Sequence, residues 1–352
     1  MQYLEVRKQY AQTAKLFLSK NNMLANGFKV LHSARYVYFP LTIYPASNKN
    51  LAHFADSIRA VVREREADEE KSGRRPDYEE ELKRILNPEE RGELARGYDP
   101  FGSIAIIELS EKLKSKEAEI GRSLIRGSST VTTVLAKSGP VKGVYRTRSV
   151  RYVAGRRTYI ANYRENGCSF IFDVRRVFFS PRLSYERSRI SKLVKNGENV
   201  AVPFAGVGPF AIEIAKSHPM SSVLAIELNP SAYRYMLKNI ELNKVSNVKA
   251  YKGDFGELAA MHKGFADRIV MPMPKTSLDF IKAACTIAKS SATFHIYSFC
   301  HANEVDEAIE AMARRFGEEK RNFVLIGVRT VRPYSKDEIE IVVDAKSDAA
   351  RR

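Results

Sequence analysis

The chain has 352 residues, enough for about two or three domains with buried cores of their own, so a small disulfide-stabilised scaffold is excluded. Hydrophobic residues make up 44% and charged residues 28%, and no stretch approaches the roughly 18 uninterrupted apolar residues that span a bilayer, which excludes a membrane-embedded protein. Lys and Arg total 58 against 41 Asp and Glu, and the net charge of +17 favours a polyanionic partner.

The first residues and the cysteines indicate the compartment. Glu5 and scattered polar side chains stand where a secretory signal needs an apolar core, so we expect a cytoplasmic protein. Cys168, Cys285 and Cys300 lie far apart and form no CxxC pair, which fits neither a disulfide framework nor a zinc site. We therefore expect no metal, and we expect each cysteine to be a buried small hydrophobe.

The sequence pattern of residues 1–70 predicts a small α/β domain. A helix is expected over 6–22 and an apolar strand over 37–41, which a Pro-Ala-Ser turn at 45–47 follows. The stretch 63–96 is dense in charges of both signs and contains glycine and proline, which is typical of a linker with exposed helices.

Residues 71–178 predict an α+β domain with a basic sheet. A strand is expected over 104–109, an amphipathic helix over 111–125, and several strands in the β-branched and aromatic runs from 131 to 177. Fourteen Lys or Arg side chains lie between 140 and 195 against three acidic ones, with aromatic residues interleaved. This mixture favours RNA or DNA binding, and the alternative is a solvated basic face above an aromatic core.

Residues 179–352 predict a doubly wound α/β domain with a mostly parallel sheet, after a helix from about 181 to 195. Only seven residues separate its last two strands, too few for a parallel crossover, so they are predicted to form an antiparallel hairpin at the sheet edge. The predicted strands are 199–204, 222–227, 248–252, 266–271, 292–298, 323–331 and 339–344, and the helices are 209–216, 231–243, 278–288 and 303–316.

A glycine-rich turn marks the expected ligand site of this domain. Gly206-x-Gly208-x-x-Ala211 follows the first strand and opens a helix, while Glu227 and Asp254 end the next two strands. A dinucleotide would place its pyrophosphate over the helix N-terminus, whereas S-adenosylmethionine offers a ribose to Glu227 and an adenine amino group to Asp254. Asp254, the terminal hairpin and the basic surface favour S-adenosylmethionine, although the glycine turn alone is also compatible with a structural turn.

A longer set of segments resembles the archaeal and eukaryotic tRNA (guanine-37, N1)-methyltransferases, which belong to the class I methyltransferases. The segments are YR at 145–146, VAG at 153–155, RENGC at 164–168, FDV at 172–174, VFFSPRLxxERxRI at 177–190 and FAGVGPF at 204–210. The resemblance covers nearly the whole chain, and SPRLxxER is its most specific segment. It implies methyl transfer from S-adenosylmethionine to N1 of the guanine 3′ to the anticodon, with the first domain binding the tRNA outer corner. We expect a monomer.

The resemblance also implies roles for individual residues. Guanine N1 carries a proton, so its methylation needs a base, and Glu186 stands where the family has its catalytic carboxylate; the alternative is an intrahelical partner of Arg182 or Arg189. Arg146 matches the arginine that contacts the target guanine, with phosphate contact as the alternative. The cofactor-binding candidates are Phe178, Phe204, Ala205, Gly206, Val207, Gly208, Glu227, Leu228, Asn229, Asp254, Phe255 and Pro272, and the RNA-binding candidates are Arg146, Arg148, Arg164, Arg182, Arg187 and Lys275.

The chain departs from this family at two places of the site, and one of them is Val202-Pro203, which replaces the acidic-apolar pair common before the glycine turn in relatives. Relatives carry Asn at the end of the fourth strand where this chain has Pro272, which has neither an amide side chain nor a backbone donor. Three functions therefore stay open: guanine N1-methylation, a wyosine-pathway reaction on the same nucleotide (methylation at carbon 7 of the tricyclic precursor or aminocarboxypropyl transfer), and tRNA binding without catalysis. A dehydrogenase is the least favoured of the alternative functions.

Overall fold

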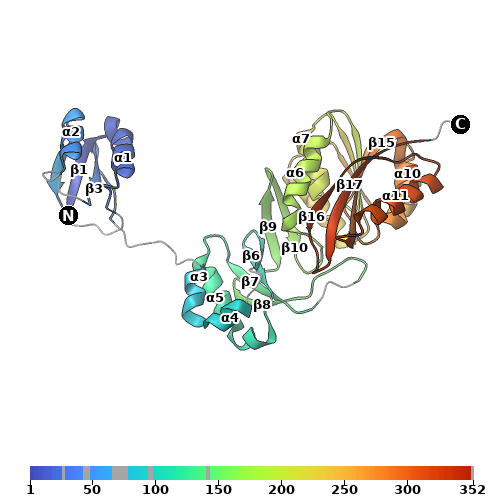
Figure 1. Ribbon diagram of the computed structural model, residues 1–352, viewed down its shortest axis with the longest axis horizontal. Helices are drawn as coiled ribbons and strands as arrows, with labels where there is room; N and C mark the ends of the chain where they lie inside the picture. Colours follow the sequence, from blue (N-terminus) through green and yellow to red (C-terminus); the bar gives the residue numbers. More distant parts are fainter. Residues whose placement is uncertain (26–27, 43–47, 66–77, 94–97, 140–142, 350–352) are drawn as a thin grey trace. The chain divides into compact units, whose positions relative to one another are not determined.

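The computed structural model describes residues 1–25, 28–42, 48–65, 78–93, 98–139 and 143–349, which fall into two units, Met1–Pro76 and Asp77–Arg352 (Figure 1). The predicted turn at 45–47 and the boundary at residue 70 lie outside the described residues. The boundary at residue 178 stays a prediction, because the second unit is compact throughout. No helix among the described residues is long and apolar enough to cross a membrane.

The first unit is a four-stranded antiparallel sheet with two helices. The strands, in the order β2-β3-β1-β4, are β1 (Gln2–Arg7), β2 (Leu31–His32), β3 (Tyr36–Pro40) and β4 (Val61–Glu64), and α1 (Ala11–Lys20) and α2 (Lys49–Ser57) accompany them. Phe17 and Phe54 stack with ring centroids 3.8 Å apart, which joins the two helices. The helix predicted over 6–22 is wrong in its first turn, because Leu4 and Val6 are buried in a central strand instead.

The second unit begins with a mixed sheet and a separate hairpin. The four-stranded sheet has the order β5-β6-β7-β8, and the hairpin pairs β9 with β10 around Asn166-Gly167. The strands are β5 (Tyr98–Phe101), β6 (Ile104–Ile107), β7 (Thr133–Lys137), β8 (Val150–Gly155), β9 (Ile160–Glu165) and β10 (Cys168–Asp173), and the helices are α3 (Tyr78–Ile85), α4 (Pro88–Glu93), η3 (Glu111–Lys116) and α5 (Glu117–Gly127). The predicted helix 111–125 is thus a 3₁₀ turn followed by an α-helix.

The rest of the second unit is a seven-stranded sheet in the order β13-β12-β11-β14-β15-β17-β16. All neighbours are parallel except those of β17, so the predicted doubly wound sheet with its terminal hairpin is confirmed. The strands are β11 (Asn199–Pro203), β12 (Ser222–Glu227), β13 (Val248–Lys252), β14 (Ala266–Met271), β15 (Ala288–His301), β16 (Val324–Pro333) and β17 (Glu338–Asp348). The helices are η4 (Pro181–Leu183), α6 (Ser184–Leu193), α7 (Pro209–Ser217), α8 (Pro230–Leu242), α9 (Phe255–Met261), η5 (Ser277–Phe280), α10 (Ile281–Ile287) and α11 (Val305–Glu318).

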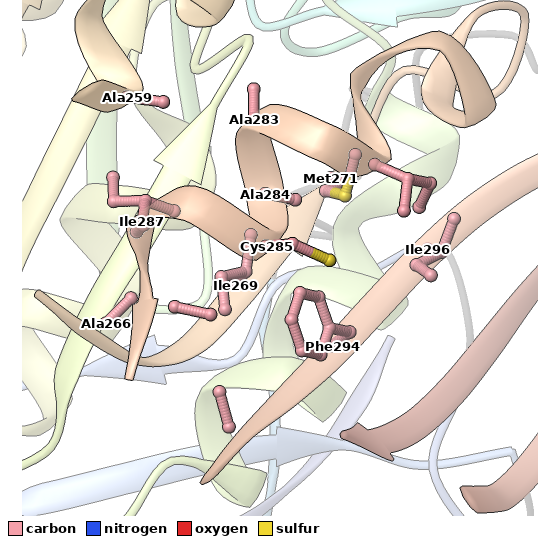
Figure 2. Close-up of a cluster of buried hydrophobic side chains, with 14 of the residues drawn as sticks. Ala259, Ala266, Ile269, Met271, Ala283, Ala284, Cys285, Ile287, Phe294 and Ile296 are labelled. Carbon is pink, nitrogen blue, oxygen red and sulfur yellow. The ribbon is translucent and has the colours of Figure 1, made fainter. Parts of the chain in front are cut away.

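Helices cover both faces of this sheet, and each face has its own core. Ile190, Phe210 and Met236 of α6, α7 and α8 belong to one cluster. The other cluster contains residues of α9, α10 and α11, and Figure 2 shows Cys285 and Phe294 within it. Burial raises the pKa of Cys285 to about 12, so its thiol is a packing group.

The cysteine prediction holds for two of the three. Cys168 and Cys285 are buried, as expected, and neither forms a disulfide. Cys300 is only partly buried, because it lies near the end of β15, and the prediction that it is buried is wrong.

A buried charge network crosses the sheet. Asp344 of β17 accepts hydrogen bonds from Arg189 of α6 at 2.6 Å and from Nδ1 of His295 on β15 at 2.6 Å. The other ring nitrogen of His295 lies 2.7 Å from Arg268, which in turn pairs with Glu198. Hydrogen bonds from His295 and Arg189 outweigh burial and lower the pKa of Asp344 to about 2. The network therefore fixes α6 against the last strands through a carboxylate that stays charged.

Replacing Asp344 with Asn should remove about 3 kcal/mol of stability, because Arg189 and His295 lose a shared charged acceptor in a mostly buried position. Urea unfolding measures the change. Glu310→Gln is the matched control, since Glu310 and its partner Arg314 are both largely exposed, and its stability should change by less than about 0.5 kcal/mol. Equal stability of Asp344→Asn and the control would contradict a structural role for the network.

Candidate active site

The glycine turn between β11 and α7 has an unusual backbone. Phe204, Gly206 and Gly208 have φ angles of 57°, 60° and 91°, all in the left-handed region. The φ of Gly208 favours glycine there, and a Cβ would also lie 2.9 Å from the end of the Ile212 side chain, which would have to shift. Pro209 then starts α7, where its missing N–H costs nothing.

The carboxylate of Glu227 holds this turn in place. Its Oε2 accepts a hydrogen bond from the backbone N–H of Gly206 at 2.7 Å, and its Oε1 accepts one from the N–H of Asn229 at 2.7 Å. Burial raises the pKa of Glu227, while these backbone donors act in the opposite direction. One side chain at the end of β12 thus joins the glycine turn to the start of α8.

Beside the turn lies a largely apolar cavity of about 510 Å³. Phe204 packs edge-on against Phe280 and Phe255, with ring centroids 4.8 and 5.7 Å away. Asp254 lines the cavity and caps α9 through Oδ1, which accepts a hydrogen bond from the N–H of Gly256 at 2.7 Å. Nine predicted cofactor residues line it: Phe178, Phe204, Gly206, Glu227, Leu228, Asn229, Asp254, Phe255 and Pro272.

Three predicted cofactor residues do not line the cavity. Ala205 and Val207 are buried, and Gly208 lies against Ile212 at the start of α7. Because no other residue separates them from Gly206 in the turn, their contact with the cofactor stays a prediction, and Ala205 and Val207 could make it only through their backbone, since their side chains face the core. They also shape the turn: the carbonyl of Ala205 accepts a hydrogen bond from Gly208, and that of Val207 accepts one from Asn239.

Sequence reasoning missed several lining residues. Thr276, Asp279 and Phe280 come from the segment after β14, and Tyr145 adjoins the predicted Arg146. The position of Tyr145 among the arginines was the one available signal. Thr276, Asp279 and Phe280 line the cavity because the segment around η5 packs against the sheet. No local sequence motif indicates that packing.

A second cavity of about 1140 Å³ adjoins the first and is strongly basic. Arg146, Phe178, Lys275 and Gly143 line both cavities. Eight Lys or Arg side chains surround the second cavity against three acidic ones: Lys114, Lys137, Arg146, Arg148, Arg151, Arg182, Lys275 and Arg332, against Asp99, Glu108 and Glu111. We call it the basic cavity, and the first one the cofactor cavity.

Phe178 and two arginines form the border between these cavities. The guanidinium carbons of Arg146 and Arg148 lie 4.7 and 5.5 Å from the centroid of the Phe178 ring. Burial lowers the pKa of Arg146, yet a guanidinium stays charged at neutral pH. A partly desolvated cation therefore stands where the two cavities meet.

Four of the six RNA candidates line the basic cavity, namely Arg146, Arg148, Arg182 and Lys275, and two do not. Arg164 is exposed on β9, away from it. Arg187 is 2% exposed and donates to Glu165 at 2.7 Å while it lies over Phe179, so the prediction that it contacts RNA is wrong. Its charge is neutralised inside the fold, where no phosphate reaches it.

Glu186 lies in the first turn of α6 and is 2% exposed. Its Oε2 accepts hydrogen bonds from Arg189 at 2.9 Å and from the hydroxyl of Tyr297 at 3.2 Å. Its Oε1 has no hydrogen-bond partner among the described residues and lies 3.3 Å from the Nε of Arg329. Glu186 lines neither cavity, and the intrahelical pair with Arg189 is present; Arg182 pairs with Asp99 instead.

The residues of the cofactor cavity fit S-adenosylmethionine. An apolar wall of Phe204, Phe255 and Phe280 suits an adenine ring, and Glu227 and Asp254 offer acceptors to hydroxyl and amino groups. No group of three His, Cys, Asp or Glu side chains that could hold a metal occurs in the described part of the chain.

This strand order, with a glycine turn after the first strand, Glu227 at the end of the second and Asp254 just after the third, defines a class I methyltransferase. A sequence profile described as the TRM5/TYW2 methyltransferase domain matches residues 161–324, and one described as the TYW2 N-terminal domain matches 78–158.

Individual relatives agree with these profiles. The tRNA (guanine(37)-N(1))-methyltransferase Trm5b of Pyrococcus abyssi is 37% identical over 284 residues, which cover 79% of this chain and 83% of the relative. The tRNA 4-demethylwyosine(37)-methyltransferase Taw21 of Saccharolobus solfataricus is 30% identical over 249 residues, 70% of this chain and 92% of the relative. The structure of aTrm5 in complex with tRNALeu has a TM-score of 0.73 at 27% identity, covering 98% of this chain and 99% of its own. The chain therefore belongs to the TRM5/TYW2 methyltransferase family.

Arg187→Met should lower the free energy of unfolding by about 3 kcal/mol, because Glu165 would stay buried without its cation. Arg164→Met on β9, the strand that also carries Glu165, is the control, and its stability should change by less than about 0.5 kcal/mol, since Arg164 is exposed. Chemical denaturation of both variants measures this. A fully stable Arg187→Met variant would contradict the structural assignment.

Proposed function

We propose that the protein transfers a methyl group from S-adenosylmethionine to N1 of guanine at position 37 of tRNA. The observation that carries the proposal is that the cofactor cavity and the basic cavity share Phe178 and Arg146 in their linings, so a sulfonium methyl and an RNA base would meet there. The Pyrococcus abyssi relative is named for this reaction, and the aTrm5 structure contains tRNALeu.

Residues of the cofactor cavity have distinct tasks in this proposal. Glu227 would hold the ribose hydroxyls, Asp254 the adenine amino group, and Phe178 the methionine end. Bound there, S-adenosylmethionine supplies an electrophilic methyl group. The glycine turn lets the backbone approach the cofactor closely, because Gly206 has no side chain on that surface.

Two charged groups would act on the acceptor base. Arg146 would stabilise negative charge that develops on guanine O6, since it is a partly desolvated cation at the junction of the cavities. We propose Glu186 as the base that takes the N1 proton, because its Oε1 accepts no hydrogen bond among the described residues, although it lies 3.3 Å from the Nε of Arg329. In the structure Glu186 lines neither cavity, so this role requires that RNA binding bring Glu186 and the guanine together.

The first unit is part of the proposal. We propose that Met1–Pro76 binds the tRNA outer corner, and that the protein acts as a cytoplasmic monomer. We also propose that the chain divides into three domains, with boundaries at residues 70 and 178.

A second candidate is C7-methylation of the tricyclic wyosine precursor at the same nucleotide. Pro272 and Met273 line the cofactor cavity and offer no side-chain amide to a guanine. The Saccharolobus solfataricus relative is named for a 4-demethylwyosine substrate, and residues 78–158 match the TYW2 N-terminal profile. The same alternative includes aminocarboxypropyl transfer to that nucleotide.

Product analysis separates these reactions. The protein is incubated with methyl-labelled S-adenosylmethionine and a tRNA transcript carrying guanine at position 37, with an adenine-37 transcript as control, and the nucleosides are identified by mass spectrometry. The proposal expects 1-methylguanosine from the first transcript only. A product formed only on precursor-bearing tRNA would replace it with the wyosine reaction, and binding without any product would indicate a non-catalytic protein.

Glu186→Gln should lower turnover by roughly 10²- to 10⁴-fold with little change in tRNA affinity, because an amide cannot take the N1 proton. Single-turnover kinetics across pH measure this. Tyr297→Phe is the control, since it removes only one hydrogen bond to Glu186 and keeps the carboxylate. Turnover of Glu186→Gln equal to that of the control, at equal thermal stability, would remove Glu186 from the base role.

A further inference from the structure

A third cavity, of about 510 Å³, lies next to the basic cavity. Tyr334 and Lys275 line both, and Lys275 also lines the cofactor cavity. Phe299, Ser298 and Glu338 are among the other residues that line the third cavity. A chain that entered the basic cavity could therefore continue past Lys275 and Tyr334 into a further space.

Tyr334 has the properties of a base-stacking platform. It directly follows β16 and is 44% exposed. Its ring lies against that of Phe299, with centroids 4.1 Å apart and an interplanar angle of 33°. Its backbone N–H donates to the carbonyl of Glu338 at 2.9 Å, which fixes the turn. An exposed ring supported by a second ring and a closed turn can accept a nucleobase without losing much side-chain freedom.

Two cations line the same cavities as this ring, and one of them is fixed in position. The Nε of Arg332 donates to Glu340 at 2.6 Å, and the side chain of Glu340 is 2% exposed. Arg332 lines the basic cavity and lies in the same hairpin as Tyr334. Lys275 is exposed and lines all three cavities. An exposed aromatic ring in a cavity lined by cations is a combination that proteins use to bind single-stranded nucleic acid.

We propose that Tyr334, supported by Phe299, stacks the nucleobase next to the methyl-accepting nucleotide, with Lys275 and Arg332 contacting the phosphates on either side. This inference rests on the proposed function and adds to it the path of the RNA. The acceptor base must reach the cofactor cavity, which Tyr334 does not line, so the base on Tyr334 belongs to a neighbouring nucleotide. Stacking discriminates little between bases, so this contact positions the loop and does not read its sequence.

The test uses an anticodon stem-loop with 2-aminopurine on either side of the acceptor guanine, and the variants Tyr334→Leu and Tyr334→Phe. Stacking quenches 2-aminopurine, so binding to the wild type and to Tyr334→Phe should quench one of the two probes. Tyr334→Leu should abolish that quenching and raise the KM for the stem-loop roughly tenfold, with kcat and S-adenosylmethionine affinity unchanged. Thermal melting checks that both variants are folded.

Quenching that persists in Tyr334→Leu would overturn the platform even if methyl transfer is normal. The protein could also make no 1-methylguanosine and still lose quenching only in Tyr334→Leu. That result would support the platform and contradict the proposed reaction. The two failures are therefore distinguishable in one set of samples.

Discussion

The hydrogen bonds of the Glu227 carboxylate are the constraint on which the site depends. This one side chain accepts from Gly206 in the glycine turn and from Asn229 at the start of α8, so two loops at neighbouring strand ends take up one arrangement. The turn needs that support, because Phe204, a bulky residue, has a left-handed backbone conformation. In that conformation Phe204 packs against Phe255 and Phe280 to form the apolar wall of the cofactor cavity.

The second requirement is that the cofactor and the RNA meet at a single place. In the proposed reaction Phe178 and Arg146 would mark this place, because they line both cavities and the Arg146 guanidinium lies over the ring of Phe178. The C-terminal hairpin contributes from the other side, through Arg332 and Tyr334. The hairpin that distinguishes this sheet from a dinucleotide fold is therefore also part of the proposed RNA surface. Buried ion pairs of Arg187 and Asp344 keep the intervening helix α6 in position.

The sequence was sufficient where signals are local. Strands 222–227, 248–252 and 266–271 were predicted with the bounds observed, because apolar runs stand between clear turns. The hairpin followed from a connection too short for a crossover. Local signals failed where burial depends on residues far away in the sequence. Arg187 is interpreted as part of a basic surface unless its partner Glu165 on β9 is known. Phe280 lines the cavity only because the segment after β14 packs there. The short helix α9 was missed, although Asp254 is a good N-cap signal, because Asp254 was assigned to the cofactor alone.

Calorimetric titration of S-adenosylmethionine into the wild type, Glu227→Gln and Glu241→Gln tests the central claim most directly. The amide of Glu227→Gln would face one of the two backbone N–H groups, so affinity should fall by about 10- to 100-fold through loss of a charge-assisted hydrogen bond. Glu241→Gln, at an exposed position of α8, should bind as the wild type does. Equal affinity of all three proteins, or no binding to any of them, would contradict the account.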